Sequence, residues 1–401
     1  MTACYLAFRI ALRHIAGMLE RAAPVLIGHE IFRHSRYGTA HPLAIPRVST
    51  CLDLCRALGW LDESNFRESP QAPAEALSRF HDPAYIAALQ AAERDQAIDP
   101  ELGEKYNLGT AENPVFGEIF RRPATAAGGT LLAARLIADR PGIVHNPAGG
   151  THHGQPARAS GFCYLNDPVL GLLALRDAGF SRLLYVDFDA HHGDGVQAAF
   201  DGDPSVLTIS IHEDRRWPRS GFYRYEPSEG VVSLPVPREL NDNELAWLVD
   251  ALVLPLGAAF GPEAVVIQAG ADAIAEDPLS RLSLSNQALL AAVEAVSALC
   301  GRVIILGGGG YNPWSVGRFW AALWGRLNGR IAPRPLPAAA EKVLRGLSWH
   351  RKAGRNPPDN WFTTLDDPPN YGPVRDAVRR LDPAYMDSSV PIVADRSRSV
   401  T

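Results

Sequence analysis

The chain has 401 residues, of which 46% are hydrophobic and 21% are charged, and its formal net charge is −5. This balance is typical of a globular protein whose core is large enough to fold without a disulfide or a structural metal. The acidic balance argues against a general nucleic-acid binder, and we expect no nucleic-acid partner. No run of about 18 uncharged apolar residues occurs, so we expect neither a membrane-spanning helix nor a membrane partner.

The cysteines are few, odd in number and scattered: Cys4, Cys51, Cys55, Cys163 and Cys300. Such usage argues against a disulfide framework and is typical of a reducing compartment, so a cytoplasmic location is expected. Cys51 and Cys55 are four residues apart, which is more typical of two small buried helix residues than of a metal pair.

We expect an N-terminal extension over residues 1–24, one main domain over 25–375 and a C-terminal tail over 376–401. The apolar stretch in the extension is too short for a secretory signal. The extension is predicted to be amphipathic, and Met18 is an alternative first residue of the protein.

Helix and strand patterns alternate through the middle of the chain. Helices are expected at 124–138, 169–177, 244–260, 286–299 and 314–327, and strands at 143–146, 182–188, 206–211, 264–268 and 302–306. The strands are short continuous apolar runs, as expected where helices cover both faces of a sheet. The alternation predicts one α/β domain with a mostly parallel sheet. Segments 333–337 and 356–369 are expected to be loops.

Chemically reactive side chains follow four of these strands. His152 and His153 follow the first, residues 187–194 the second, Asp272 the fourth and Tyr311 the fifth. Ligand sites of parallel sheets lie beyond the carboxyl ends of the strands, so these side chains are expected to meet at one edge.

The segment 187–194 is dense in ionisable groups: Asp187, Asp189, His191, His192 and Asp194. Burying such groups unpaired is costly, and a bound dication would relieve that cost. Asp189 and His191 would point the same way from extended chain, and Asp272 could supply a third ligand. Two carboxylates and one imidazole with an open position are typical of a catalytic zinc site. The alternative is a solvated turn rich in Asp and Gly.

His152 and His153 lie in a Gly-rich loop, where paired histidines serve as general acid and base or as metal ligands; a structural pair is the alternative. Asp187 and Asp194 are available to orient and tune the imidazoles. Tyr311 follows four glycines and could donate to an oxyanion beside a metal, or anchor a loop. No Lys-Ser or Lys-Thr follows the glycines, which excludes a Walker P-loop.

Five ordered segments resemble the zinc-dependent histone deacetylase superfamily: GGTHHG (149–154), SGFCYLND (160–167), YVDFDAHHGDGV (185–196), QAGADAIAEDPL (268–279) and GGGGYN (307–312). The resemblance runs from about residue 25 to 330. The run YNLGTAENPVF (106–116) is most similar to the bacterial acetoin-utilisation branch, which is class I-like. The resemblance implies a three-layer α/β/α, arginase/deacetylase-like fold with a mostly parallel central sheet.

The resemblance also implies a role for each matching residue. It implies one zinc ion bound by Asp189, His191 and Asp272, and a catalytic set of His153 with Asp194, His152 with Asp187, and Tyr311 as oxyanion donor. It implies substrate contacts from Glu112, Gly161, Phe162, Trp217, Leu279 and Gly309, with Arg47 on the acetate-release side. It implies structural K⁺ or Na⁺ sites at Asp187, Asp189, His191, Ser210 and Ile211, and at Phe200, Asp203 and Val206.

Two positions depart from the family pattern. Glu112 stands where the rim carboxylate is usually Asp, in a loop one residue longer than in some relatives. Thr151 replaces a larger apolar residue, which would widen the inner cavity.

The sequence therefore predicts a zinc-dependent amidohydrolase that removes acetyl or short acyl groups from lysine side chains of proteins or peptides. One alternative is a deacetylase of acetylpolyamines or other small amides, for which Glu112 and Glu213 are candidate acidic rim residues. Another is a non-catalytic acyl-lysine binding module. The physiological substrate and the oligomeric state are left open by the sequence.

Overall fold

The computed structural model describes residues 21–35, 37–38 and 41–388. Its centre is a nine-stranded sheet in the order β2-β1-β3-β9-β8-β4-β5-β7-β6, in which only the β6–β7 pair is antiparallel. The strands are β1 (Val25–Gly28), β2 (Phe66–Glu68), β3 (Gly142–Asn146), β4 (Leu183–Asp187), β5 (Val206–Glu213), β6 (Arg224–Glu226), β7 (Val231–Val236), β8 (Ala264–Gln268) and β9 (Arg302–Leu306).

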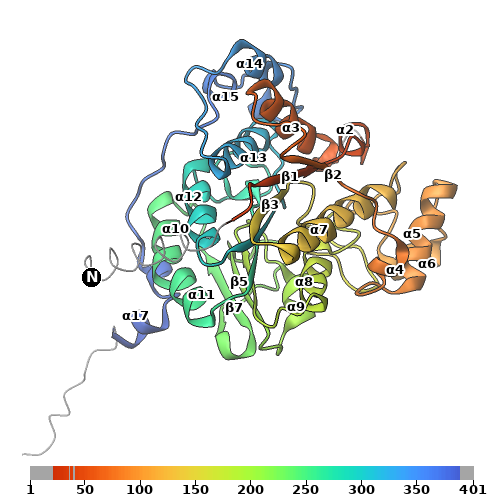
Figure 1. Ribbon diagram of the computed structural model, residues 1–401, viewed down its shortest axis with the longest axis horizontal. Coiled ribbons are helices and arrows are strands. Elements are labelled where there is room, and N and C mark those ends of the chain that lie inside the picture. The colour runs from red at the N-terminus through yellow and green to blue at the C-terminus, as the bar shows by residue number, and fades with distance from the viewer. Residues whose placement is uncertain (1–20, 36, 39–40, 389–401) are drawn as a thin grey trace, which may run out of the picture.

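Helices cover both faces of this sheet (Figure 1). The helices in the two layers are α3 (Val48–Ala57), α7 (Arg121–Asp139), α8 (Asp167–Asp177), α9 (Asp194–Phe200), α10 (Asp242–Leu248), α11 (Leu254–Phe260), α12 (Asn286–Ser297) and α13 (Pro313–Leu327). The peripheral helices are α2 (Ile31–His34), α4 (Ala74–Leu77), α5 (Pro83–Asp95), α6 (Pro100–Tyr106), α14 (Ala338–Arg345), α15 (Asn360–Thr363), α16 (Asp376–Arg379) and α17 (Pro383–Ser388).

Successive residues of the central strands enter opposite layers. In β4, Leu183 and Tyr185 pack with α7, α8 and α9, whereas Leu184 and Val186 pack with α3 and α10 to α13. Side chains of a strand alternate between faces, so a strand covered on both sides must be apolar throughout. The predicted three-layer α/β/α fold with a mostly parallel sheet is confirmed, and all five predicted strands are present.

The helical stretch expected at 244–260 begins at Asp242 and has a π-helical turn, Val249–Val253, between α10 and α11. Its start is fixed by a capping box between Asn241 and Glu244.

The segment 356–369 is not wholly a loop, because α15 lies within it. Trp361 of this helix is 5% exposed, and its ring lies 5.3 Å from that of Trp314 in α13. This long-range packing outweighs the local Pro, Asn and Asp signals that predicted a loop.

The stretch Asp242–Phe260 is also long and apolar enough to cross a membrane by length and composition alone. Its Leu245, Leu248 and Leu252 are buried in the main core of the domain. This packing is typical of the core helix of a folded domain.

The described residues at both ends contact the domain. The Arg21 Nη2 donates to the Ser297 carbonyl oxygen (2.7 Å), and Val378 and Leu381, in and after α16, are buried in the main core. Most of the expected extension and tail, residues 1–20 and 389–401, lies outside the described residues, and the predicted domain bounds stay a prediction.

One buried carboxylate, Asp167 at the start of α8, holds the loop that carries the histidine pair. It accepts hydrogen bonds from the backbone N–H of Gly150 (3.0 Å) and of Thr151 (2.8 Å) and from the Thr130 hydroxyl (2.6 Å). Burial raises the pKa of Asp167, and these donors oppose that rise. Asp167 thus anchors the start of the β3–α8 connection, and the Asn166 side chain supports the part beyond it by donating to the Gly154 carbonyl oxygen at 2.9 Å.

We predict that Asp167→Ala lowers the free energy of unfolding by about 2–4 kcal/mol, since it leaves several buried donors without an acceptor. The matched control is Asp177→Ala at the far end of the same helix, where the carboxylate is exposed and pairs with Arg79. Its expected effect is below about 1 kcal/mol. Urea unfolding followed by tryptophan fluorescence measures both, and equal losses in the two variants would contradict the prediction.

Candidate active site

Four adjacent strands place the predicted site residues at one edge of the sheet. In the order β3-β9-β8-β4, these strands are followed by His152 and His153, by Tyr311, by Asp272, and by Asp189 with His191. Segments more than a hundred residues apart in the chain thus meet because their strands are hydrogen-bonded neighbours and run parallel.

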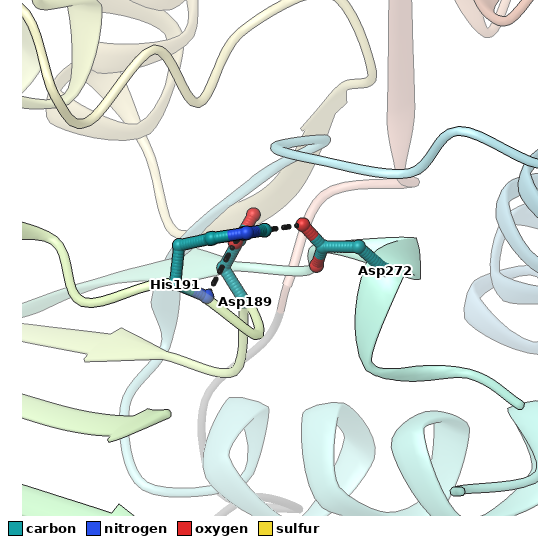
Figure 2. Close-up of side chains that lie close together, drawn as sticks. All are labelled: Asp189, His191 and Asp272. Atoms are coloured by element: carbon teal, nitrogen blue, oxygen red, sulfur yellow. Dashed lines mark hydrogen bonds and ion pairs between the residues drawn. The ribbon is translucent and has the colours of Figure 1, made fainter. Parts of the chain in front are cut away.

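Asp189, His191 and Asp272 form a candidate metal site. One ligand atom from each lies within 4.8 Å of the others, and all three residues are buried. The His191 Nδ1 is 3.2 Å from Asp189 Oδ1 and 2.9 Å from Asp272 Oδ2, and Figure 2 shows the ring directed toward the two carboxylates. Two carboxylates and one imidazole suit a divalent first-row metal with an open position for a further ligand.

Backbone groups hold the carboxylates in place. Asp189 accepts hydrogen bonds from the backbone N–H of Gly309 (2.7 Å) and of His191 (3.0 Å), and Asp272 accepts from that of Ala190 (3.0 Å). A Cβ on Gly309 would lie 2.1 Å from Asp272 Oδ2, so no side chain fits there. The backbone is therefore fitted closely around the carboxylate oxygens of Asp189 and Asp272.

The charges of the three residues also suit a cation. Burial and the neighbouring Asp189 raise the pKa of Asp272. Burial disfavours a charged His191, but the carboxylates of Asp189 and Asp272 outweigh it and raise the pKa of its imidazole. A divalent cation would neutralise the same excess of negative charge.

The two adjacent histidines have carboxylate partners of their own. The His152 Nδ1 lies 2.7 Å from Asp187 Oδ2, and the His153 Nδ1 lies 2.7 Å from Asp194 Oδ1. Asp187 Oδ2 also accepts from the Tyr185 hydroxyl (2.8 Å). Each imidazole is thus oriented by a carboxylate, with its Nε2 left to face the site.

The surroundings push the two imidazoles to opposite protonation states. Burial disfavours a charged His152, but Asp187 and Asp189 outweigh it and raise its pKa to about 9. Burial and the nearby charge of His152 lower the pKa of His153 to about 3. Such a separation of pKa values in a pair assigns different acid–base roles to its members.

A channel of about 300 Å³ leads to the histidines and the candidate metal site. Its lining contains every predicted substrate residue except Gly309: Glu112, Gly161, Phe162, Trp217 and Leu279, together with His153, His191, Arg216, Pro278 and Tyr311. Gly309 lines the inner cavity instead.

Aromatic rings form part of the wall of this channel. The Trp217 ring stands edge-on to His153, with centroids 4.6 Å apart, and the Phe162 ring lies 5.8 Å from that of Tyr311. Gly161 has a φ of 54°, and a Cβ there would lie 2.2 Å from the Trp217 ring. Only glycine lets the chain pass so close to this wall.

Asp277 is a site residue that sequence reasoning missed, although it lies within the quoted segment 268–279. Its carboxylate accepts hydrogen bonds from the backbone N–H of Tyr311 (2.7 Å) and of Leu279 (2.9 Å). Asp277 thereby links the backbone of two channel residues, Tyr311 and Leu279.

Burial raises the pKa of the Tyr311 phenol, as do Asp272 and Asp189, so the hydroxyl stays a neutral donor.

A second, smaller cavity of about 50 Å³ lies on the inner side of the site and contains Arg47, Arg122, Thr151 and Gly309 in its lining. The Arg47 Nη1 donates to the Gly308 carbonyl oxygen (2.7 Å), and the Arg122 Nη1 donates to that of Ser35 (3.3 Å). Within the described part of the chain, neither guanidinium forms an ion pair. Arg122 lies in α7 with no motif around it, so nothing in the sequence pointed to it.

The predicted cation residues are on and beside β4 and β5. Asp187 pairs in register with Ser210, and the Ser210 hydroxyl lies 2.9 Å from His212 Nδ1. In the second set, the Asp203 backbone N–H donates to the Phe200 carbonyl (2.9 Å), and the Val206 N–H donates to that of Asp203 (3.1 Å). Monovalent cations at these positions stay a prediction.

The two candidate rim carboxylates differ in position. Glu112 lines the channel and accepts from the Asn107 and Asn113 side-chain amides, both at 3.3 Å. Glu213 is 2% exposed and forms a two-bond pair with Arg216, at 2.9 and 2.7 Å. Glu213 is therefore not an acidic rim residue, because its charge is buried and already paired.

Comparisons with known proteins agree with this geometry. Residues 41–327 match the family model described as Histone deacetylase domain. Histone deacetylase 8 of Xenopus tropicalis is 35% identical over 306 residues, which span 73% of this chain and 80% of that protein. The acetoin utilization protein AcuC of Bacillus subtilis is 32% identical over 339 residues, spanning 81% of this chain and 86% of that protein.

A Caenorhabditis elegans relative is 33% identical over 334 residues, spanning 78% of this chain and 63% of that protein. The crystal structure of an HDAC homolog complexed with SAHA matches with a TM-score of 0.86 and 36% identity, covering 92% of this chain and 100% of that chain. A crystal structure of an HDAC homolog from Aquifex aeolicus matches with a TM-score of 0.85 and the same identity and coverage.

We predict that Gly309→Ala abolishes metal binding, because its Cβ would displace a carboxylate of the metal site. Gly117→Ala is the matched control, since a Cβ at Gly117 meets nothing within 4 Å. Metal content by elemental analysis after dialysis against zinc checks this. A Gly309→Ala protein that retains one metal per chain would contradict it.

Proposed function

The chain belongs to the histone deacetylase family, in its acetoin-utilisation-like branch, and we propose that it removes acetyl or other short acyl groups from lysine side chains of proteins or peptides. The observation that carries this proposal is a buried Asp–His–Asp cluster able to hold a metal, which lies beside a histidine pair and next to a channel with mainly apolar walls. Such a channel suits the four methylenes of a lysine side chain and keeps bulk water from the amide.

The metal proposed for Asp189, His191 and Asp272 is zinc, one ion per chain, since two carboxylates and one imidazole with an open position are a catalytic zinc donor set. When bound, zinc would polarise the amide carbonyl and lower the pKa of a water beside it.

His153 is the proposed general base and acid. Its low pKa keeps the imidazole neutral, so that its Nε2 can accept a proton from the attacking water and pass one to the leaving amine. Asp194 fixes its tautomer through Nδ1. His152, kept charged by Asp187, supplies positive charge beside the developing oxyanion.

Tyr311 is the proposed donor to that oxyanion, and Phe162, Trp217 and Leu279 are proposed to contact the alkyl stem of the substrate. Gly161 and Gly309 keep the wall and the base of the site free of side chains. Glu112 at the channel wall is the proposed acceptor for backbone N–H groups of a peptide substrate.

The inner cavity is the proposed exit for the acetate product. Arg47, predicted from the sequence, and Arg122, seen only in the structure, would both attract a carboxylate. Thr151 lines this cavity, and its hydroxyl donates to the Leu165 carbonyl oxygen at 2.5 Å.

We further propose bound monovalent cations, a cellular location and the bounds of the domain. A structural K⁺ or Na⁺ is proposed at Asp187, Asp189, His191, Ser210 and Ile211, and another at Phe200, Asp203 and Val206. A cytoplasmic location without nucleic-acid or membrane partners is proposed from the composition and the cysteine usage. The deacetylase domain is proposed to span 25–375.

An acetylpolyamine is the less favoured substrate, because Glu213 is paired with Arg216 and, among the described residues, Glu112 alone supplies a carboxylate to the channel lining. A binding module without activity is disfavoured, because every residue of the proposed machinery is present.

We predict that chelation of the metal abolishes deacetylation of an acetyl-lysine peptide and that one equivalent of zinc restores it. Removing the metal should also lower the melting temperature, because a ligand that binds only the native state stabilises it. Activity assays and thermal unfolding on the same samples measure both. Full activity in a protein shown to be metal-free would contradict the mechanism.

We predict that Tyr311→Phe lowers kcat by about 10²–10³-fold, as for the loss of one oxyanion donor. Zinc content should stay at one per chain, because the phenol is not a proposed ligand. The control is Tyr106→Phe, a buried tyrosine outside the site, which should keep full activity. An unchanged kcat in zinc-loaded Tyr311→Phe would remove the phenol from the mechanism.

A further inference from the structure

The segment 326–355 is strongly basic in a chain that is acidic overall. It contains one acidic residue, Glu341, against eight basic ones: Arg326, Arg330, Arg334, Lys342, Arg345, Arg351, Lys352 and Arg355. Its net charge of +7, from eight minus one, contrasts with −5 for the whole chain. The segment lies almost entirely after residue 327, where the match to the family model ends.

Only part of this charge is neutralised within the protein. Arg326 pairs with Glu294, Arg334 with Asp366, and Arg345 with Glu341 and Asp359. In the part of the chain that the structure describes, Lys342, Arg351, Lys352 and Arg355 form no ion pair, and all four are exposed.

Part of the segment forms the wall of a cavity beside the substrate channel. This cavity, of about 400 Å³, is lined by residues 346–351, by residues 41–42 and 44–46, and by Pro278 and Tyr311. Pro278 and Tyr311 also line the channel, so the two spaces adjoin. Arg351 and His350 are part of the lining, and none of the described residues that line it is an Asp or a Glu.

The wall is fixed to the domain by packing. The Trp349 ring lies 6.4 Å from that of Trp314 in α13, and the Arg351 carbonyl accepts from the Gly354 backbone N–H at 3.0 Å. A Cβ on Gly354 would lie 2.4 Å from the Trp349 carbonyl oxygen, which shows how tightly the turn closes. Arg351 is thereby held at the edge of the cavity.

We propose that the cavity between 41–46 and 346–351 is a substrate-recognition subsite that binds an Asp or Glu side chain next to the acyl-lysine in the polypeptide substrate. This inference rests on the proposed function and names its substrate class. The cavity presents the Arg351 side chain and, among the described residues, no carboxylate in its lining, and it adjoins the channel proposed to receive the acyl-lysine. An acidic side chain in the substrate supplies the missing charge, whereas a lysine or arginine there meets repulsion.

The test uses three acetyl-lysine peptides of equal length whose flanking residues are acidic, neutral or basic. With the zinc-loaded full-length chain at low salt, kcat/KM should be roughly three- to fivefold higher for the acidic than for the basic peptide, the range of a partly exposed ion pair. The difference should lie in KM and shrink as salt is raised, because salt screens exposed charges.

Arg351→Glu should reverse the preference between the acidic and basic peptides. Arg330→Glu is the matched control, with the same charge change in the same basic segment but lining a different cavity, so it should leave the preference as it is. Thermal unfolding confirms that both variants fold. Arg351→Ala, which should abolish the preference without reversing it, serves if the charge reversal does not fold.

Equal kcat/KM values for the acidic and basic peptides would overturn the proposal. So would an Arg330→Glu variant that loses the preference as fully as Arg351→Glu, because the effect would then come from the overall field. Hydrolysis of the neutral peptide by the unmodified chain tests the deacetylase function separately. Its absence would count against that function, and its presence with no charge preference would count against the subsite alone.

Discussion

The structure depends on burying an excess of negative charge at the carboxyl edge of its sheet. Asp187, Asp189 and Asp272 are each at most 1% exposed, and the space between them is closed by glycine backbone. Unpaired carboxylates at such depth would cost several kcal/mol each, so their neighbours must compensate. Backbone N–H groups and imidazoles surround these carboxylates, and two of them, Asp189 and Asp272, form the candidate cation site with His191.

This compensation links stability to chemistry. Asp187 stabilises a charged His152, and that charge in turn suppresses protonation of His153. Burial and the charge of His152 together lower the pKa of His153, so a carboxylate that does not touch His153 contributes to keeping its imidazole neutral.

Much of this arrangement could be predicted from the sequence because it is local. Continuous apolar runs indicated β4, β8 and β9, and the polar residues directly after them had no place in a core. Parallel strands place such residues at a common edge. This rule predicted that Asp189, His191 and Asp272 lie close together, as the structure shows. The motif resemblance then supplied the channel residues, five of which line one cavity.

The residues that could not be predicted act through contacts distant in sequence. Arg122 lines the inner cavity from the first turn of α7, and Trp361 of α15 packs beside Trp314 of α13. Glu213 was a candidate for the rim, yet its carboxylate is buried and paired with Arg216. Each outcome depends on which elements pack together, which local patterns do not encode.

The four consecutive glycines before Tyr311 limit how this enzyme could diversify. A Cβ would lie 2.1 Å from the Pro147 carbonyl oxygen at Gly307, 2.7 Å from Gln268 at Gly308, 2.1 Å from Asp272 at Gly309 and 2.6 Å from Val316 at Gly310. Each position is blocked by a different neighbour, so no single compensating change elsewhere would make room for side chains along the turn. Inherited variation is therefore closed off along this turn, whereas loops that form the outer walls of the channel can lengthen or change charge without disturbing it.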